Sequence, residues 1–93
     1  MNPIVSIVIP LFNKETTILR AVNSVFSQTN KNFELIIVND GSTDNSAKLV
    51  ESLSGDDRIR LITQNNAGPG TARNRGIREA KTDLIAFLDA DDE

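Results

Sequence analysis

Two aspartates follow an unbroken run of five apolar residues near the end of the sequence. The run occupies residues 84–88, and Asp89 and Asp91 come directly after it, two positions apart. An apolar run of this length predicts a strand that is buried on both faces of a parallel sheet. In extended backbone, side chains two positions apart point to the same side, so we expect the two carboxylates to converge. Convergent oxygen ligands suit Mg²⁺ or Mn²⁺ carrying phosphate, which makes this pair a candidate metal–phosphate site.

Asp40 and Arg73 are two further residues whose types and positions suit a bound nucleotide. Asp40 follows an apolar run and precedes Gly41, whose tight turn would leave the carboxylate able to accept a hydrogen bond from the ring N–H of a base. Arg73 lies near the start of a predicted helix, behind a glycine-rich loop, where a phosphate or a base comes within its reach.

Each of these candidates also has an ordinary structural explanation. Asp89 and Asp91 would then belong to a solvated turn after a strand, and Arg73 to a charged surface helix. Asp40 would begin an Asx-type turn, and residues 42–44 would cap the following helix. Whether the fold brings these residues together decides between a functional site and these structural roles.

Four apolar segments alternate with three helical patterns along the chain. The predicted strands occupy residues 4–9, 33–38, 59–62 and 84–88, and the predicted helices occupy residues 15–28, about 47–53 and 71–80. The order β-α-β-α-β-α-β predicts an α/β fold, a single Rossmann-like domain over residues 1–93 with a parallel sheet and helices on both faces. We expect the third strand to lie near an edge of the sheet. The third helix is expected to turn four residues inward: Ala72, Gly76, Ile77 and Ala80.

The predicted topology places the candidate residues at one edge of the sheet. Ligands bind such sheets at the carboxyl ends of the strands. Loops leave those ends at residues 10–14, 39–46, 65–70 and 89–93, and all of the candidates lie within or just after these loops. This convergence is the strongest functional signal in the sequence.

The composition narrows the class of protein. The 93-residue sequence contains no Cys and no His, which excludes disulfides, a His-type zinc site and a Ser-His-Asp triad within this chain. The formal net charge of −3 argues against nucleic acid or an anionic membrane surface as a partner. Residues 4–9 are too short to cross a bilayer, and no basic segment precedes them. We therefore expect a cytoplasmic protein, with the cytoplasmic face of the membrane as the alternative location of a parent enzyme.

Four sequence blocks together resemble glycosyltransferase family 2, which has the GT-A fold. The blocks are VSIVIPLFN at residues 5–13, ELIIVNDGSTD at 34–44, NAGPGTARNRG at 66–76 and FLDADD at 87–92. They stand in the family's order and cover nearly the whole chain, so the resemblance is specific to the family and says little about the sugar. The dinucleotide-binding pattern G-x-G-x-x-G and the P-loop pattern are both absent.

The resemblance implies an enzyme that moves a sugar from a nucleotide-diphosphate donor, with a UDP-sugar as the leading choice, to an acceptor hydroxyl. It implies that Pro10 and Phe12 border the base and the ribose, that Asp40 contacts the base with Arg73 beside it, and that Asp89 meets the ribose or the metal. Asp91, together with Asp89, would hold Mn²⁺ or Mg²⁺ on the diphosphate, whose charge the cation neutralises as it leaves.

The resemblance also implies a longer parent enzyme. Family members continue past the D-x-D motif, and their later part carries the acceptor site and the general base, which no residue here matches. We therefore expect residues 1–93 to be a truncated, donor-binding domain that does not transfer sugar alone. Its acceptor, whether a glycan, a lipid or another hydroxyl compound, is not assigned. We also expect an exposed sheet edge and self-association of the fragment.

Two other functions stay open at the level of the sequence. A HAD-type phosphatase would use Asp89 as its nucleophile, although that D-x-D normally lies near the N-terminus of the chain. A non-catalytic nucleotide-binding module is the second alternative. Metal-dependent UDP binding that is lost in Asp91→Ala favours the glycosyltransferase, and trapping of Asp89 by beryllofluoride favours the phosphatase.

Overall fold

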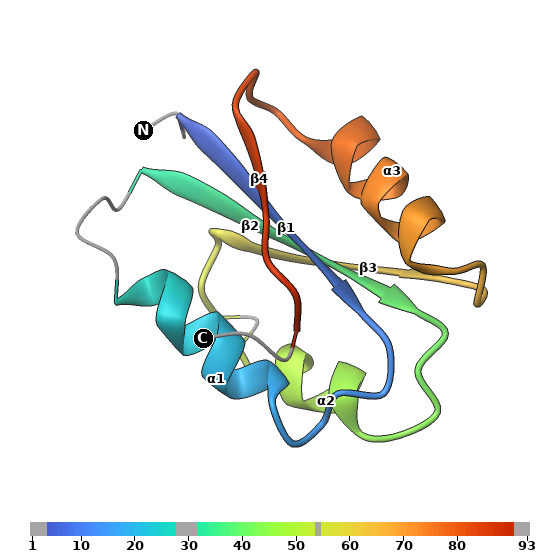
Figure 1. Ribbon diagram of the computed structural model, residues 1–93. Coiled ribbons are helices and arrows are strands. Elements are labelled where there is room, and N and C mark those ends of the chain that lie inside the picture. Colours follow the sequence, from blue (N-terminus) through green and yellow to red (C-terminus); the bar gives the residue numbers. More distant parts are fainter. Residues whose placement is uncertain (1–3, 28–31, 54, 91–93) are drawn as a thin grey trace.

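A parallel sheet with helices on both faces is seen in the computed structural model, which describes residues 4–27, 32–53 and 55–90 (Figure 1). The elements are β1 Val5–Leu11, α1 Ile18–Phe26, β2 Phe33–Asp40, α2 Ser46–Glu51, β3 Ile59–Gln64, α3 Pro69–Glu79 and β4 Ile85–Phe87. The strand order is β3-β2-β1-β4, and every neighbouring pair is parallel. The predicted α/β class and the predicted edge position of the third strand are therefore confirmed.

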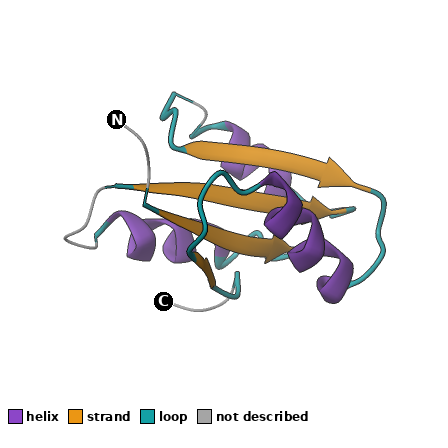
Figure 2. Cartoon of the chain, turned by 90° about the horizontal axis from the view of Figure 1, so that it is seen from above, coloured by secondary structure: helices purple, strands orange, loops and turns teal. Residues whose placement is uncertain are grey.

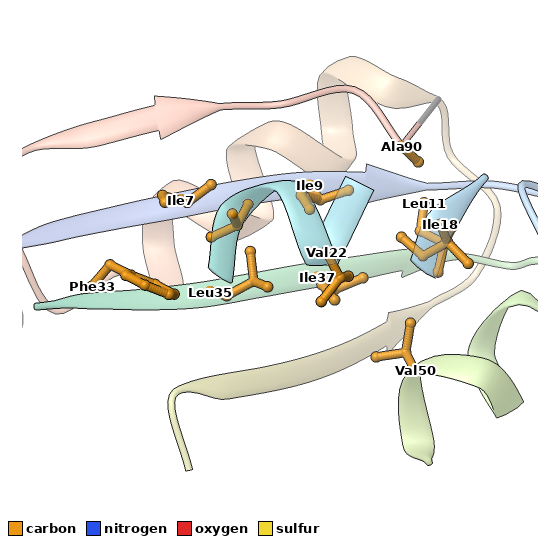
Figure 3. Close-up of a cluster of buried hydrophobic side chains, with 11 residues drawn as sticks. Ile7, Ile9, Leu11, Ile18, Val22, Phe33, Leu35, Ile37, Val50 and Ala90 are labelled. Atoms are coloured by element: carbon orange, nitrogen blue, oxygen red, sulfur yellow. The ribbon is translucent and has the colours of Figure 1, made fainter. Parts of the chain in front are cut away.

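The sheet separates two apolar layers, because alternate residues of a strand point to opposite faces. Figure 2 shows the strands running between helices on both sides. Odd-numbered residues of β1 and β2 pack with α1 and α2 in the larger layer, which includes Ile7, Ile9, Leu11, Ile18, Val22, Leu35, Ile37 and Val50 (Figure 3). Even-numbered residues pack against α3 in the smaller layer, namely Val8, Ile36 and Val38 with Ala72. Each large side chain buried in this way contributes about 1.5–3 kcal/mol.

Helix α3 lies very close to the sheet because small residues face it. A Cβ placed on Gly76 would come within 2.4 Å of Val8 Cγ1, so only glycine fits there. The prediction of inward small residues is confirmed for Ala72 and Gly76, which are buried. It is wrong for Ile77, which is 44% exposed. The prediction also holds for Ala80, which packs against the smaller layer, whereas Ile77 lies one helical step past Gly76 and is not covered.

Strand β1 continues through Pro10, where the sequence had suggested that it stops. Pro10 pairs with Val38 of β2, and Leu11 pairs with Asn39. Proline interrupts a strand by lacking an N–H. Here the backbone groups of the even-numbered residues of β1 bond to β4 and not to β2. The pairing with β4 ends at Val8, whose carbonyl accepts from the Leu88 N–H. The absent N–H of Pro10 therefore costs β1 no bond to β2.

Helices α1 and α3 also begin at residues other than those predicted. Helix α1 begins at Ile18 rather than at residue 15, because residues 15–17 form a turn in which Lys14 O accepts from the N–H groups of Thr17 and Ile18. Helix α3 begins at Pro69, inside the predicted loop, since proline at the first helical position needs no N–H partner. No helix within residues 4–27, 32–53 and 55–90 is long and apolar enough to cross a membrane.

The last strand is not buried on both faces, and this prediction is wrong. β4 spans only Ile85–Phe87 and lies at the edge of the sheet, where β1 is its partner. Leu84 is 65% exposed and Phe87 is 48% exposed. Of the apolar run, Ile85 packs towards α3 and Leu88 packs against the larger layer. Both faces of the run are partly covered, but among the described residues β4 has a neighbouring strand on one side alone, and Leu84, Ala86 and Phe87 are exposed.

Candidate functional site

A pocket of about 520 Å³ opens at the carboxyl ends of the strands. Its walls come from four parts of the chain: the end of β1, the end of β2, the β3–α3 loop with the start of α3, and the segment after β4. The lining residues are Pro10, Leu11, Phe12, Lys14, Asp40, Asn66, Gly68, Pro69, Arg73, Asp89 and Ala90. The five residues that the sequence assigned to a nucleotide and that the structure describes, Pro10, Phe12, Asp40, Arg73 and Asp89, all line it.

Asp40 is buried at the end of β2, and its carboxylate organises the β3–α3 loop. Oδ1 accepts from Gln64 Nε2 at 2.9 Å and from the Ala67 N–H at 2.8 Å. Oδ2 accepts from the Gly68 N–H at 2.9 Å and from Asn66 Nδ2 at 3.4 Å. Asn66 Nδ2 also donates to the Asp40 backbone oxygen at 2.9 Å. These donors occupy roughly all four lone-pair positions that a carboxylate offers.

The hydrogen bonds to Asp40 also set its charge state. Burial by itself raises the pKa of the Asp40 carboxyl, but the bonds from Gln64 and from the N–H groups of Ala67 and Gly68 together outweigh it. The pKa therefore lies below its ordinary value, and the group is a carboxylate at neutral pH. Such a group accepts hydrogen bonds well and is a poor general base.

The Asx-type turn suggested for Asp40 belongs instead to the residue before it. Asn39 Oδ1 accepts from the Ser42 N–H at 3.0 Å. Of the residues suggested as helix caps, Asp44 lies just before the N-cap residue Asn45, and its Oδ1 accepts from the Ser46 N–H at 2.9 Å; the N-cap residue itself makes no side-chain cap bond. Ser42 and Thr43 bond to a different loop.

That other loop follows β1, and Asn13 ties it to the loop after β2. Asn13 has φ of 51°, in the left-handed region that asparagine tolerates better than most residues. Its Oδ1 accepts from the Thr43 N–H at 2.8 Å and from the Asp44 N–H at 3.3 Å, and its own N–H donates to Ser42 Oγ at 3.1 Å. Sequence reasoning missed this role. The signal available was an asparagine directly after a strand end, which on its own indicates only a turn.

Phe12 gives the pocket an aromatic wall, and Pro10 lies on the same strand end. Phe12 is 45% exposed and lines the pocket. Aromatic faces of this kind stack on nucleobases, at about 1–3 kcal/mol per base. The wall is held in place because Asn13, the next residue, is bonded into the neighbouring loop.

Arg73 and Lys14 bring positive charge to the pocket, and Asp89 brings a carboxylate. The Arg73 guanidinium has no hydrogen bond or ion pair with any part of the chain that the structure describes. Asp89 is exposed at the pocket, two residues beyond the end of β4. Asp91, the predicted metal ligand, lies outside the described residues. Among those residues, no group of three or more acidic, His or Cys side chains is placed to hold a metal ion.

A divalent ion that is bound to a nucleotide needs fewer than three protein ligands. Magnesium is commonly bound through one or two carboxylates together with substrate phosphates. An exposed Asp89 carboxylate at the pocket wall, with cationic side chains elsewhere in the lining, fits a metal–diphosphate pair.

Comparison with known proteins decides the family. The sequence model described as glycosyl transferase family 2 matches residues 6–93. The chain belongs to glycosyl transferase family 2. It is 47% identical, over 95% of its length, to an uncharacterized glycosyltransferase of Rickettsia felis, of which it covers 15%. It is 43% identical, over 99% of its length, to the uncharacterized glycosyltransferase EpsJ of Bacillus subtilis, of which it covers 27%.

Solved family 2 structures show the same GT-A fold. The structure of S. aureus TarS 1-349 in complex with UDP-GlcNAc is 29% identical and superposes with a TM-score of 0.88, covering 95% of this chain and 26% of that one. The chain thus spans about a seventh to a quarter of the length of these relatives. Membership of this family decides against the HAD-type phosphatase.

Proposed function

We propose that the chain is the donor-binding part of a glycosyltransferase that moves a sugar from a nucleoside-diphosphate donor, a UDP-sugar, to an acceptor hydroxyl. The observation that carries this proposal is a pocket at the carboxyl ends of the strands that is lined by Phe12, Arg73 and Asp89, each from a different part of the chain. Each has a chemistry that a nucleoside diphosphate requires: a stacking face, a cation and an oxygen ligand. The UDP-GlcNAc held by the similar TarS structure supports the choice of donor.

Within this proposal, different residues of the pocket bind different parts of the donor. Phe12 and Pro10 form the wall for the base and the ribose. The Asp40 Oδ2 atom accepts the ring N–H of the base by releasing the Asn66 amide, whose bond of 3.4 Å is the longest of the four. Arg73 lies beside the base and directs its charge to the phosphates.

Asp89, with Asp91 as its predicted partner, would hold Mg²⁺ or Mn²⁺ at the diphosphate. A bound ion of this kind supplies charge neutralisation to the diphosphate as it leaves. The chain's own part is to orient the diphosphate by Arg73 and to keep the Asp89 carboxylate at the pocket wall.

We also propose that residues 1–93 bind the donor without transferring the sugar. Transfer requires a general base near the acceptor hydroxyl. The described acidic residues of the pocket are Asp40 and Asp89. Asp40 has a lowered pKa and four bonded donors, and Asp89 is assigned to the metal, so neither is available as the base. The open edge of β4 is, in the same proposal, a surface for self-association.

Calorimetric titration of the 93-residue chain with UDP, with and without Mn²⁺, tests the function. We expect binding that Mn²⁺ strengthens, and a loss of roughly tenfold or more in affinity in Arg73→Ala, since a hydrogen bond to a charged group is worth about 1.5–3 kcal/mol. Arg78→Ala is the matched control, because Arg78 is an exposed residue of the same helix outside the pocket. Equal losses in the two variants, or no UDP binding by the unaltered chain, would contradict the proposal.

A further inference from the structure

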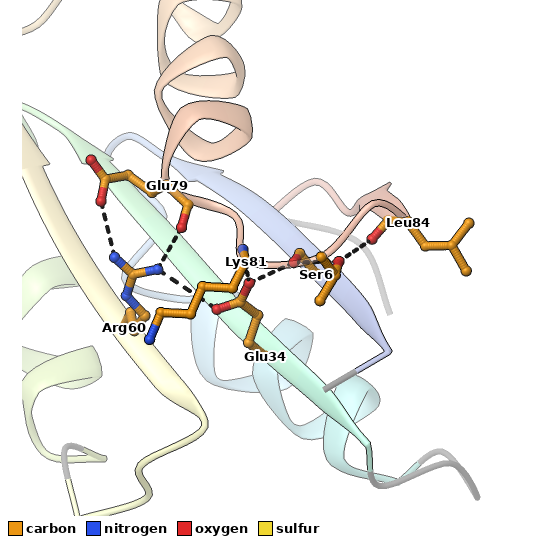
Figure 4. A network of polar contacts seen from close by, with 7 residues as sticks. Ser6, Glu34, Arg60, Glu79, Lys81 and Leu84 are labelled. Atoms are coloured by element: carbon orange, nitrogen blue, oxygen red, sulfur yellow. Dashed lines mark hydrogen bonds and ion pairs between the residues drawn. The ribbon is translucent and has the colours of Figure 1, made fainter. Parts of the chain in front are cut away.

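A second buried carboxylate lies far from the pocket, at the opposite end of β2. Glu34 is 5% exposed, and it lies six positions before Asp40 on β2, about 20 Å of extended chain. Its Oε2 atom accepts from Ser6 Oγ at 2.6 Å and from the Lys81 N–H at 2.6 Å (Figure 4). Its Oε1 atom lies 3.6 Å from Nη1 of Arg60. None of these contacts is explained by nucleotide binding.

The partners of Glu34 hold the connection between α3 and β4. Arg60 Nη1 donates to the backbone oxygen of Glu79, the last residue of α3, at 2.7 Å, and Nη2 donates to Glu79 Oε1 at 2.9 Å. Thr82 Oγ1 donates to Leu84 O at 2.7 Å and lies 2.8 Å from Ser6 Oγ, whose one hydrogen goes to Glu34. Figure 4 shows the connection held in this way over the start of β1, β2 and β3.

This anchoring matters because β4 specifies its own register poorly. A strand is held in register by the side chains that it buries. β4 has three residues, of which Ala86 and Phe87 are exposed, and its partner in the sheet is β1. Its alignment on β1 rests on few backbone bonds, including Ser6 N–H to Leu84 O at 2.8 Å and Leu88 N–H to Val8 O at 3.1 Å.

The position of Asp89 depends on that alignment. A slip of one residue along β1 would move Asp89 by about 3.3 Å and turn its side chain to the other face of the sheet. The Glu34 network fixes residues 79–84, and the chain reaches Asp89 within five residues of Leu84.

We infer that Glu34 is a positioning residue, which sets the register of β4 on β1 and thereby places Asp89 at the pocket. The inference rests on the proposed function for the role of Asp89. The register itself is measurable without any ligand.

Amide hydrogen exchange of the 93-residue chain, followed by NMR, reads the register directly. The reporters are the amides of Ser6 and Leu88, which bond across β1 and β4, and the amide of Leu35, which donates to Arg58 O at 2.7 Å elsewhere in the sheet. In Glu34→Leu we expect protection at Ser6 and Leu88 to fall roughly tenfold more than at Leu35. Glu34→Gln keeps one acceptor oxygen and should show a smaller loss with the same pattern, which covers the case in which Glu34→Leu does not fold.

Val50→Ala is the matched control for a loss of stability alone. Val50 is buried in the larger layer, away from the network, so its truncation should lower protection evenly at Ser6, Leu35 and Leu88. UDP titration supplies the second readout: Glu34→Gln should show a smaller Mn²⁺-dependent gain in affinity and keep the metal-free affinity, whereas Val50→Ala should keep both.

Even loss of protection in the Glu34 variants, as in Val50→Ala, would overturn the inference. So would a Mn²⁺-dependent gain that is undiminished in Glu34→Gln. Absence of UDP binding by the unaltered chain would refute the proposed function instead, and the exchange pattern would still decide the role of Glu34 in the register.

Discussion

The Gly68 N–H donates to Asp40 Oδ2 at 2.9 Å, which fastens the residue before α3 to the end of β2. Gly68 stands at the N-cap position with φ of 99°, a conformation that strongly favours glycine, and Pro69 follows as the first helical residue. The start of α3 is thus set by a buried carboxylate of the neighbouring strand. Because Arg73 lies one turn further along α3, the same bond determines where its guanidinium enters the pocket.

Replacing the Asp40 carboxylate should destabilise the domain as well as weaken nucleotide binding. In Asp40→Asn, the amide NH₂ must face two of the donors that now point at the carboxylate, leaving buried donors unsatisfied. We expect a loss of about 1–3 kcal/mol in the free energy of unfolding, measured by urea denaturation. Asp83→Asn, at an exposed residue of the α3–β4 connection, should change stability by less than about 0.5 kcal/mol. A stable Asp40→Asn variant would show that the loop does not depend on this carboxylate.

The stability of the domain should fall in acid, in part through Asp40. Its folded pKa lies below the ordinary value of 3.8, so the unfolded chain takes up a proton first as the pH falls. The contribution of Asp40 is therefore complete well above pH 3.8 and is lost as the pH drops from there through the lowered folded pKa. Asp44 and Asp56, whose pKa values are also lowered, add to the loss in the same direction. Denaturation at a series of pH values should give a shallower acid slope for Asp40→Asn than for the unaltered chain, and identical slopes would refute this assignment.

A methyl group on Gly76 should separate α3 from the sheet. Alanine normally favours a helix over glycine by about 1 kcal/mol. At position 76, however, the new Cβ would lie 2.4 Å from Val8 Cγ1, and we expect Gly76→Ala to lose about 1–3 kcal/mol of stability in urea. Gly70→Ala in the same helix meets no atom within 4 Å and should be neutral or slightly stabilising. Shortening the opposing side chain, in Gly76→Ala combined with Val8→Ala, should restore part of the helix packing; additive losses would show that the two residues do not press on each other.

Asn13 should be sensitive both to its side chain and to its backbone conformation. Asn13→Gly keeps a residue suited to φ of 51° and removes the side-chain bonds to Thr43 and Asp44. Asn13→Ala removes the same bonds and adds the cost of the left-handed conformation, about 1–2 kcal/mol. We expect the free energy of unfolding to decrease in the order unaltered chain, glycine variant, alanine variant. The exposed Asn23→Ala in α1 serves as the control and should not destabilise the chain. A glycine variant as unstable as the alanine variant would contradict the role assigned to the backbone.

The open edge of β4 should make the chain associate at high concentration. Leu84 and Phe87 are exposed beside this edge, and unpaired edges with apolar side chains favour strand pairing between copies. Phe87→Lys should weaken association in sedimentation velocity runs at increasing concentration, because a charged edge opposes pairing. Leu19→Lys, at an exposed position of α1, changes the same charge elsewhere and should have no effect. A chain that stays monomeric throughout the concentration series would rule out this surface.

Much of the fold was predictable because the sequences of β1 and β2 are typical of buried strands. Their apolar, β-branched runs are the two central strands, and the alternation with helices then leaves a parallel sheet as the simplest arrangement. The pocket followed from the same topology, since parallel strands deliver their carboxyl ends to one edge. The residues that lie at this edge could therefore be predicted from the sequence. Their roles in binding a ligand stay predictions.

The errors came from residues whose surroundings are not local. The run at 84–88 is as apolar as β2 and yet lies at an edge, because burial depends on what packs against a strand. Ile77 fits the helical pattern but is exposed. Gly76 is the residue that touches the sheet, and Ile77 lies one helical step past it. The roles of Glu34 and Asn13 could not be predicted, because their partners are far away in the chain.

Pro10 has an effect on the sheet that reaches beyond its own strand. The next bond of the β1–β4 ladder would run from residue 10 to Leu88 O, and proline has no hydrogen to give. The two strands must therefore part at this point: Leu11 stays beside Asn39, while Ala90 turns to pack in the layer with α1. The pocket opens in that fork, with Pro10 and Leu11 on one branch and Asp89 and Ala90 on the other. Because residue 10 has no hydrogen to donate, the β1–β4 ladder ends here and does not continue across the pocket.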